Sequence, residues 1–170
     1  MKALIAASFI SLATVAAAAD YTVDPLISTK QVRVSVRLNS GQAATEFRMP
    51  AWAPGDYQIF NYGTKIEQVS FTLRGRPTRF TQGSDRNLWT LPDGADRVSY
   101  VVNESRGNFS PNLRVTPGEI FISGPGVFGW FEGFADERHT VLLPGTKEMA
   151  AVALNPLESV GDYARFSAKS

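Results

Sequence analysis

Apolar and polar residues alternate with a period of two along most of the chain, which is the repeat of a β-strand with one buried face. The segment 30–38 is the clearest case, because its apolar residues fall at every second position: Val32, Val34, Val36 and Leu38. The same repeat points Val69, Phe71 and Leu73 inward in one segment, and Val98, Tyr100 and Val102 in another. Shorter runs predict strands at 87–91, 119–123, 127–131, 140–143 and 163–167.

Turn-forming residues separate these runs at 39–41, 74–77, 92–94 and 116–118. Helix signals are weak: 61–69 could begin with one helical turn, and 146–154 fits either a short helix or a strand. Many short strands with regular turns are typical of an all-β fold. We therefore expect an antiparallel β-sandwich or saddle-like sheet with little helix, in a single domain over residues 20–170.

The first 19 residues have the pattern of a secretory signal peptide. A positive start at Lys2 precedes an apolar stretch over 3–15, and small residues follow, with Ala17 and Ala19 in A-x-A spacing before Asp20. The stretch is short for a membrane span, which makes an N-terminal anchor the weaker interpretation. The sequence thus predicts cleavage after Ala19, a secreted or periplasmic location, and no membrane attachment afterwards.

Charge and cysteine content limit the classes of partner and the kind of stabilisation that we expect. Without Lys2 the chain carries 16 basic and 16 acidic residues, so its net charge gives no general attraction to nucleic acid or to anionic lipid. Cysteine is absent, so an exported domain of this kind depends on its apolar core and not on disulfides.

Residues for catalysis are scarce. His139 is the one histidine, there is no H-E-x-x-H, and a histidine-based zinc site or a Cys-His pair within the sequence is excluded. No G-x-S-x-G marks a serine nucleophile. Asp56, Glu132, Asp136 and Glu137 lie near aromatic segments, and two such carboxylates could support glycoside hydrolysis, although solvated loop acids are the simpler interpretation. We predict a non-enzyme without cofactor, and His139 as a surface residue at a strand start.

Two segments are unusually aromatic. Residues 49–62 contain Trp52, Tyr57, Phe60 and Tyr62, and residues 127–134 contain Phe128, Trp130, Phe131 and Phe134 around Glu132. Aromatic side chains bury large areas, so packing is the favoured interpretation. The alternative is an interface for a domain, a peptide or a sugar, formed by Phe128, Trp130, Phe131 and Glu132.

The segment "MPAWAPGDYQIFNYGTKIEQV" resembles the P-x-W-x-P-G-[ST]-Y segment of the N-terminal domain of the glycyl-aminopeptidase family of zinc metallopeptidases. The resemblance rests on five residues and extends in order over the remaining strand segments: Pro50, Trp52, Pro54, Gly55 and Tyr57. Asp56 departs from the pattern, because the family usually has Ser or Thr there. A second departure is Thr146-Lys147-Glu148, which stands where the family commonly has a tryptophan.

The resemblance implies a β domain that packs against a zinc catalytic domain and helps to shape its substrate cleft. The catalytic residues of that family have no positions in this sequence, so we expect a non-catalytic domain, truncated or standalone, whose partner is a zinc peptidase domain encoded downstream or a peptide ligand. Glu132 is a candidate for holding a substrate's free amino group. The alternative function is an independent periplasmic binding module for peptide or glycan.

Within that segment the prolines and the glycine have a structural interpretation. Pro50 and Pro54 fix φ, and Gly55 accepts conformations that other residues avoid. We therefore expect a rigid turn that Trp52 and Tyr57 brace from the inside.

Overall fold

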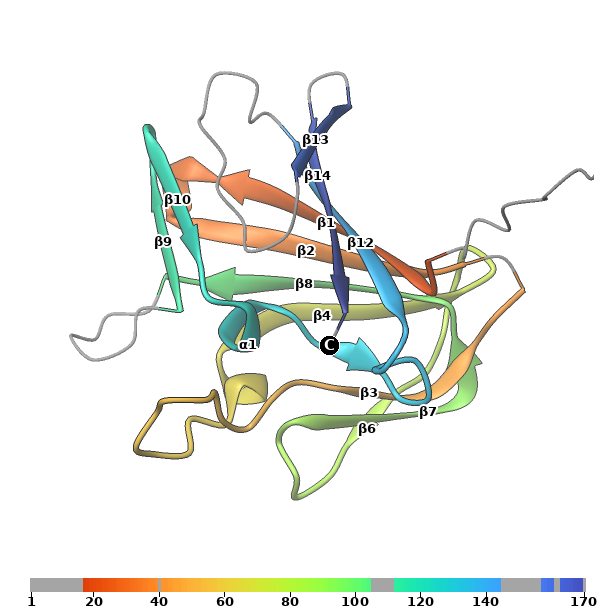
Figure 1. Ribbon diagram of the computed structural model, residues 1–170. Coiled ribbons are helices and arrows are strands. Elements are labelled where there is room, and N and C mark those ends of the chain that lie inside the picture. Colours follow the sequence, from red (N-terminus) through yellow and green to blue (C-terminus); the bar gives the residue numbers. More distant parts are fainter. Residues whose placement is uncertain (1–16, 40, 105–111, 145–156, 161–162, 170) are drawn as a thin grey trace, which may run out of the picture.

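The computed structural model describes residues 17–39, 41–104, 112–144, 157–160 and 163–169. Within them strands are by far the main secondary structure, which confirms the predicted all-β class (Figure 1). Three short helical segments interrupt the strands: η1 (Ile27–Thr29), η2 (Tyr62–Thr64) and α1 (Gly124–Val127). No helix in the described part of the chain is long and apolar enough to cross a membrane.

The strands form three sheets. The largest has eight strands, in the spatial order β13 (Leu157–Val160), β14 (Tyr163–Lys169), β12 (Arg138–Pro144), β1 (Ala19–Leu26), β2 (Gln31–Leu38), β8 (Arg97–Asn103), β4 (Ile66–Leu73) and β5 (Arg76–Pro77). A four-stranded sheet has the order β11 (Trp130–Phe131), β3 (Ala44–Arg48), β7 (Leu88–Ala95) and β6 (Thr81–Gln82). β9 (Leu113–Thr116) and β10 (Glu119–Ile122) form a separate hairpin.

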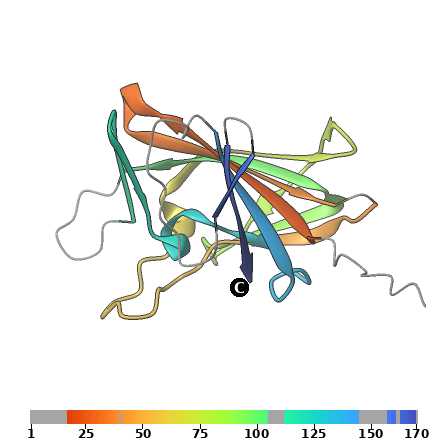
Figure 2. The same ribbon diagram turned by 45° about the horizontal axis from the view of Figure 1, so that its top comes forward.

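The smaller sheet lies against one face of the larger sheet, and the core fills the space between them (Figures 1 and 2). Phe47 of β3 connects the two layers, because its ring packs 5.7 Å from Phe71 of β4 and 5.8 Å from Tyr100 of β8. The alternation in β2 places its apolar residues in this core, as predicted, and all are buried: Val32, Val34, Val36 and Leu38.

Pairing is antiparallel except between β1 and β12, which run parallel. Such a pair needs a long crossover connection, and here the chain between the two strands builds most of the fold. Ala18 and Ala19 are buried at the start of β1, and the Ala18 amide donates to the Arg138 carbonyl at 2.7 Å. The fold therefore includes the last two residues of the predicted signal segment, whose cleavage stays a prediction.

The turn predictions are confirmed where the local residues determine the backbone conformation. Arg74 and Gly75 both have positive φ, 52° and 78°, and form the two-residue hairpin turn between β4 and β5. The turn predicted at 92–94 is wrong as a chain reversal. These residues lie inside β7, where the register against β3 shifts and Gly94 has a φ of 76°.

The segment 127–131 was predicted as one strand, and only Trp130–Phe131 forms one. The preceding residues make the short helix α1, in which the Phe128 amide donates to the Gly124 carbonyl at 2.8 Å. Pro125 suits the first turn of a helix, because a proline there loses no hydrogen bond. The ambiguous segment 146–154 lies outside the described residues.

His139 corrects a further expectation, because its side chain is buried and not at the surface. It stands near the start of β12, as predicted, with its ring edge-on to Tyr21 at 5.4 Å. Nε2 lies 3.4 Å from the Ala135 carbonyl oxygen, and Nδ1 has no hydrogen-bond partner. Burial lowers the pKa of His139 below its ordinary 6.5, which the Ala135 carbonyl and the charge of Glu137 oppose.

This burial predicts a pH dependence of stability. Below a pH of about 6.5 the unfolded chain binds a proton at His139 that the folded chain binds less readily, so stability is lost as the pH falls. The His139→Phe variant keeps a ring against Tyr21 and cannot titrate. Urea unfolding between about pH 8 and pH 5.5 should show the native chain losing stability relative to this variant. Parallel losses in both proteins would contradict the assignment to His139.

Candidate functional site

The segment 50–61, here called the aromatic loop, is closed at its neck by backbone hydrogen bonds. The Pro50 carbonyl accepts from the Tyr62 amide at 3.1 Å, and the Ala51 carbonyl accepts from the Phe60 and Asn61 amides, each at 2.9 Å. Its two ends therefore lie side by side, as in a compact Ω-loop. Figure 1 shows it extending from the body of the domain between β3 and η2.

Asn87 holds the base of the aromatic loop from β7's side of the domain. Its Oδ1 accepts from the Gly63 amide and its Nδ2 donates to Asn61 Oδ1, both at 2.9 Å. A Cβ at Gly63 would lie 2.2 Å from the Arg86 carbonyl oxygen, so this close approach requires glycine. Asn87 is itself buried, and the loop is thus attached to a fixed part of the fold.

The tip of the aromatic loop is a tight turn. The Asp56 amide donates to the Ala53 carbonyl at 3.0 Å, with Pro54 and Gly55 between them and a Gly55 φ of 94°. Proline followed by a glycine with positive φ is the pattern of a type II turn. The rigid turn expected from Pro54 and Gly55 is therefore present.

Asp56 fixes the interior of the loop. Its carbonyl accepts from Trp52 Nε1 at 2.7 Å, and its Oδ2 accepts from the hydroxyl of buried Tyr62 at 3.0 Å. Burial, followed by this hydrogen bond, raises the pKa of Tyr62 to about 12. The residue that departs from the family pattern thus has a structural task here, and it is not a free catalytic carboxylate.

Three large side chains of the loop are exposed. Tyr57 is fully exposed, Ile59 is 70% exposed and Trp52 is 47% exposed, whereas Phe60 stacks on Tyr62 at 5.7 Å. The expectation that Tyr57 braces the turn from inside is wrong. Trp52 does brace it, through its indole N–H, but with half of its side chain exposed. A rigid loop presenting apolar side chains suits recognition of a partner.

Beside the loop, Arg48 at the end of β3 joins two carboxylates. Its Nε donates to Glu132 Oε1 at 2.7 Å, and its Nη1 donates to Asp85 Oδ2 at 2.8 Å. The hydrogen bond to Glu132, followed by that to Asp85, raises the Arg48 pKa, against desolvation. The Asn87 amide, and then Arg48, lower the pKa of Asp85. Because Glu132 already binds a cation, part of its capacity to hold a substrate amine is taken.

The second predicted cluster is divided by the fold. Phe131 is 1% exposed and belongs to the core, where its ring lies 5.4 Å from that of Phe47. Phe128 is half-buried and meets Tyr21 edge-on at 5.6 Å. Trp130 is partly exposed beside Arg48, its partner across β3 and β11. These residues therefore do not form one exposed face.

Two buried tyrosines fix the chain that leads to Trp130. The Tyr21 hydroxyl donates to the Gly129 carbonyl at 2.9 Å, and the Tyr100 hydroxyl donates to the Val127 carbonyl at 2.9 Å. Tyr100 also accepts from the Gly129 amide at 3.1 Å. Burial raises the pKa of both phenols, so they remain neutral donors at physiological pH.

Substitution of Gly129 is predicted to disturb this region strongly. A Cβ there would lie 2.5 Å from Phe47 Cζ and 2.6 Å from both the Arg48 carbonyl oxygen and Met49 Sδ. Such overpacking typically costs about 1–3 kcal/mol, and backbone cannot move as freely as a side chain. Gly129→Ala should therefore lower the urea midpoint markedly. Gly83→Ala is the matched control, because no atom lies within 4 Å of a Cβ there and Gly83, like Gly129, does not have a left-handed φ. Equal losses in the two variants would contradict the packing argument.

Sequence reasoning missed several residues of this surface. Ile59 is a large apolar residue in a turn-rich segment, and that mismatch was an available signal. Arg48 and Asp85 carried no such signal, because their partners are distant in the sequence. Arg48 lies 84 residues from Glu132, and Asp85 lies 37 residues from Arg48. Among the described residues no group of three or more His, Asp or Glu side chains could hold a metal ion.

Comparison with known proteins identifies the family of this chain. The model of the Peptidase M61 N-terminal domain matches residues 20–170. A crystal structure of an aminopeptidase N family protein from Idiomarina loihiensis has a similar fold, with a TM-score of 0.71 and 20% sequence identity. The match covers 89% of this chain and 27% of that chain, and no curated protein matches. This confirms the resemblance found in the sequence: the chain belongs to the Peptidase M61 N-terminal domain family.

Proposed function

We propose that this chain is a non-catalytic domain of an exported metallopeptidase, and that its aromatic loop docks on a zinc peptidase domain. One observation carries the proposal: a rigid loop, tied to the core through Asn87, exposes Trp52, Tyr57 and Ile59. Exposed apolar groups of this kind become favourable contacts when a partner covers them. The match of residues 20–170 to a peptidase N-terminal domain makes a peptidase domain the partner to test.

The sequence supports the non-catalytic part of the proposal. It lacks H-E-x-x-H, and its single histidine is buried with a lowered pKa, which suits packing more than zinc binding. The purified chain is therefore expected to leave peptides with N-terminal glycine or alanine intact in the presence of zinc. Zinc-dependent cleavage of these peptides would overturn this part.

Docking is tested with a peptidase domain that carries H-E-x-x-H. Such a domain is sought downstream of the Ser170 codon and elsewhere in the same genome, and it is expressed as a separate chain. Size-exclusion chromatography with light scattering should show a one-to-one complex. Absence of a complex with every such domain would overturn docking.

The exposed aromatic side chains also favour a second candidate, an independent binding module for peptide or glycan. Trp52 lies in the loop and would report such a ligand by fluorescence. Saturable titration with one member of a peptide or oligosaccharide panel, together with no complex with a peptidase domain, would favour this candidate over docking.

A further inference from the structure

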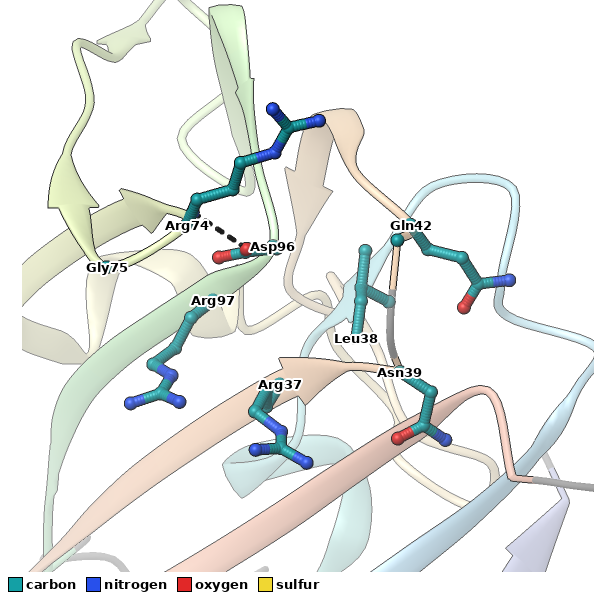
Figure 3. Close-up of a pocket in the computed structure, with 9 residues that line it drawn as sticks. Arg37, Leu38, Asn39, Gln42, Arg74, Gly75, Asp96 and Arg97 are labelled. Atoms are coloured by element: carbon teal, nitrogen blue, oxygen red, sulfur yellow. Dashed lines mark hydrogen bonds between the residues drawn. The ribbon is translucent and has the colours of Figure 1, made fainter.

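A hollow of about 340 Å³ lies at the end of the eight-stranded sheet, where β2, β8 and the β4–β5 turn meet (Figure 3). Its polar lining consists mainly of Arg37, Arg74, Arg97, Asp96, Asn39 and Gln42. None of these residues belongs to the aromatic loop or to the Arg48 cluster. The volume is at the lower end of the range for small-molecule sites, about 300–1,000 Å³.

Two arginines of this hollow lie directly opposite each other on neighbouring strands. Arg37 of β2 and Arg97 of β8 are direct partners in the antiparallel ladder. Residues in such positions have their Cβ atoms about 5 Å apart, and like charges there destabilise a sheet. Asp20 offers Arg37 partial compensation, with Oδ2 3.8 Å from Nη2. The Arg97 side chain has no hydrogen bond or ion pair in the described part of the chain.

The carboxylate in the hollow is already engaged. Asp96 Oδ2 accepts from the Arg74 amide at 2.8 Å, which supports the left-handed φ of 52° at Arg74. Figure 3 shows this bond, and it shows the Arg74 side chain extending away from the other two arginines. Arg37, Arg97 and Asn39 extend to one common side. These three side chains therefore offer donors on one side of the hollow.

We propose that Arg37 and Arg97 form a binding site for a phosphate group, with the Asn39 amide as a further donor. Guanidinium groups bind phosphate through paired hydrogen bonds. A phosphate monoester carries nearly two negative charges at neutral pH and can offset both arginines, which a single carboxylate cannot. The group would belong to a small soluble phosphate ester or to a lipid headgroup.

Binding is tested by titrating inorganic phosphate into the full chain in a calorimeter at low salt. We expect saturable binding that weakens at least about tenfold in the Arg37→Gln/Arg97→Gln variant, since two charge-assisted contacts are lost. The Arg33→Gln/Arg138→Gln variant is the matched control. It removes the same charge from exposed strand residues outside the hollow and should bind phosphate normally.

The two sources of phosphate are separated with vesicles. Phosphatidylcholine vesicles containing phosphatidic acid are compared with pure phosphatidylcholine for sedimentation of the chain. Arginine-dependent binding to the former assigns the site to a lipid headgroup, and binding of inorganic phosphate alone assigns it to a soluble ester. The proposal is overturned if neither probe binds, or if the control variant loses as much binding as the Arg37/Arg97 variant.

One further readout distinguishes a ligand site from a structural pair. Because like charges oppose each other in the free sheet, Arg97→Gln should raise the melting temperature of the free chain while it weakens phosphate binding. A lowered melting temperature would instead show that the arginine pair stabilises the sheet, and it would contradict the charge argument.

Discussion

Replacing Phe47 by alanine is expected to lower the free energy of unfolding by about 3–5 kcal/mol, the typical effect of truncating a buried phenylalanine. The ring is 0% exposed and joins both layers of the fold. Four aromatic rings surround it at centroid distances of 5.4–5.9 Å: Phe71, Trp89, Tyr100 and Phe131. Because these rings come from both sheets, removal of Phe47 opens a space between the two layers.

Urea unfolding measures this effect, with Phe47→Leu as a milder variant in case the alanine variant does not fold. Phe121→Ala is the control, because Phe121 lies on the β9–β10 hairpin with 43% of its side chain exposed. That substitution should change stability by less than about 0.5 kcal/mol. A Phe47→Ala loss no larger than the Phe121→Ala loss would refute the central position assigned to Phe47.

The second large effect concerns docking. If the aromatic loop binds a peptidase domain, Tyr57→Ala combined with Ile59→Ala should weaken the complex by about 100-fold or more. Buried anchors at interfaces commonly contribute about 2 kcal/mol or more each, and about 1.4 kcal/mol is a factor of ten. Surface plasmon resonance with the immobilised peptidase domain measures the dissociation constant.

Stability provides the internal check on this variant. The side chains of Tyr57 and Ile59 are exposed to solvent, so the double substitution should leave the urea midpoint nearly unchanged. Trp52 is left in place because its indole N–H holds the loop through Asp56. Phe121→Ala removes an exposed aromatic side chain elsewhere and should bind normally. Equal affinity of the native and double-variant chains for the peptidase domain would show that the loop is not part of the interface.

The sequence predicted those parts of the fold that local patterns determine. Alternation placed the apolar residues of β2 and β8 in the core, and Gly75 marked the β4–β5 turn. It did not indicate that β1 pairs in parallel with β12, or that His139 is buried against Tyr21. Both depend on contacts between segments more than 100 residues apart, which no local pattern records.

The candidate site was predictable in composition and not in orientation. Pro54 and Gly55 specify the turn locally, so its presence followed from the sequence. No local pattern records the orientation of Tyr57, because the base of the loop is held by Asn87, which lies 24 residues beyond the Gly63 amide that it binds. Likewise, Glu132 was a recognisable carboxylate, but its ion pair with Arg48 forms only when β11 joins β3.

Hydrogen exchange of the backbone amides tests the docking claim most directly. Exchange is compared between the free chain and the chain mixed with the peptidase domain that carries H-E-x-x-H, under conditions where chromatography shows the complex. The account predicts slower exchange in residues 50–61 and unchanged exchange in the β9–β10 hairpin, residues 113–122. A complex in which residues 50–61 exchange as in the free chain would contradict it.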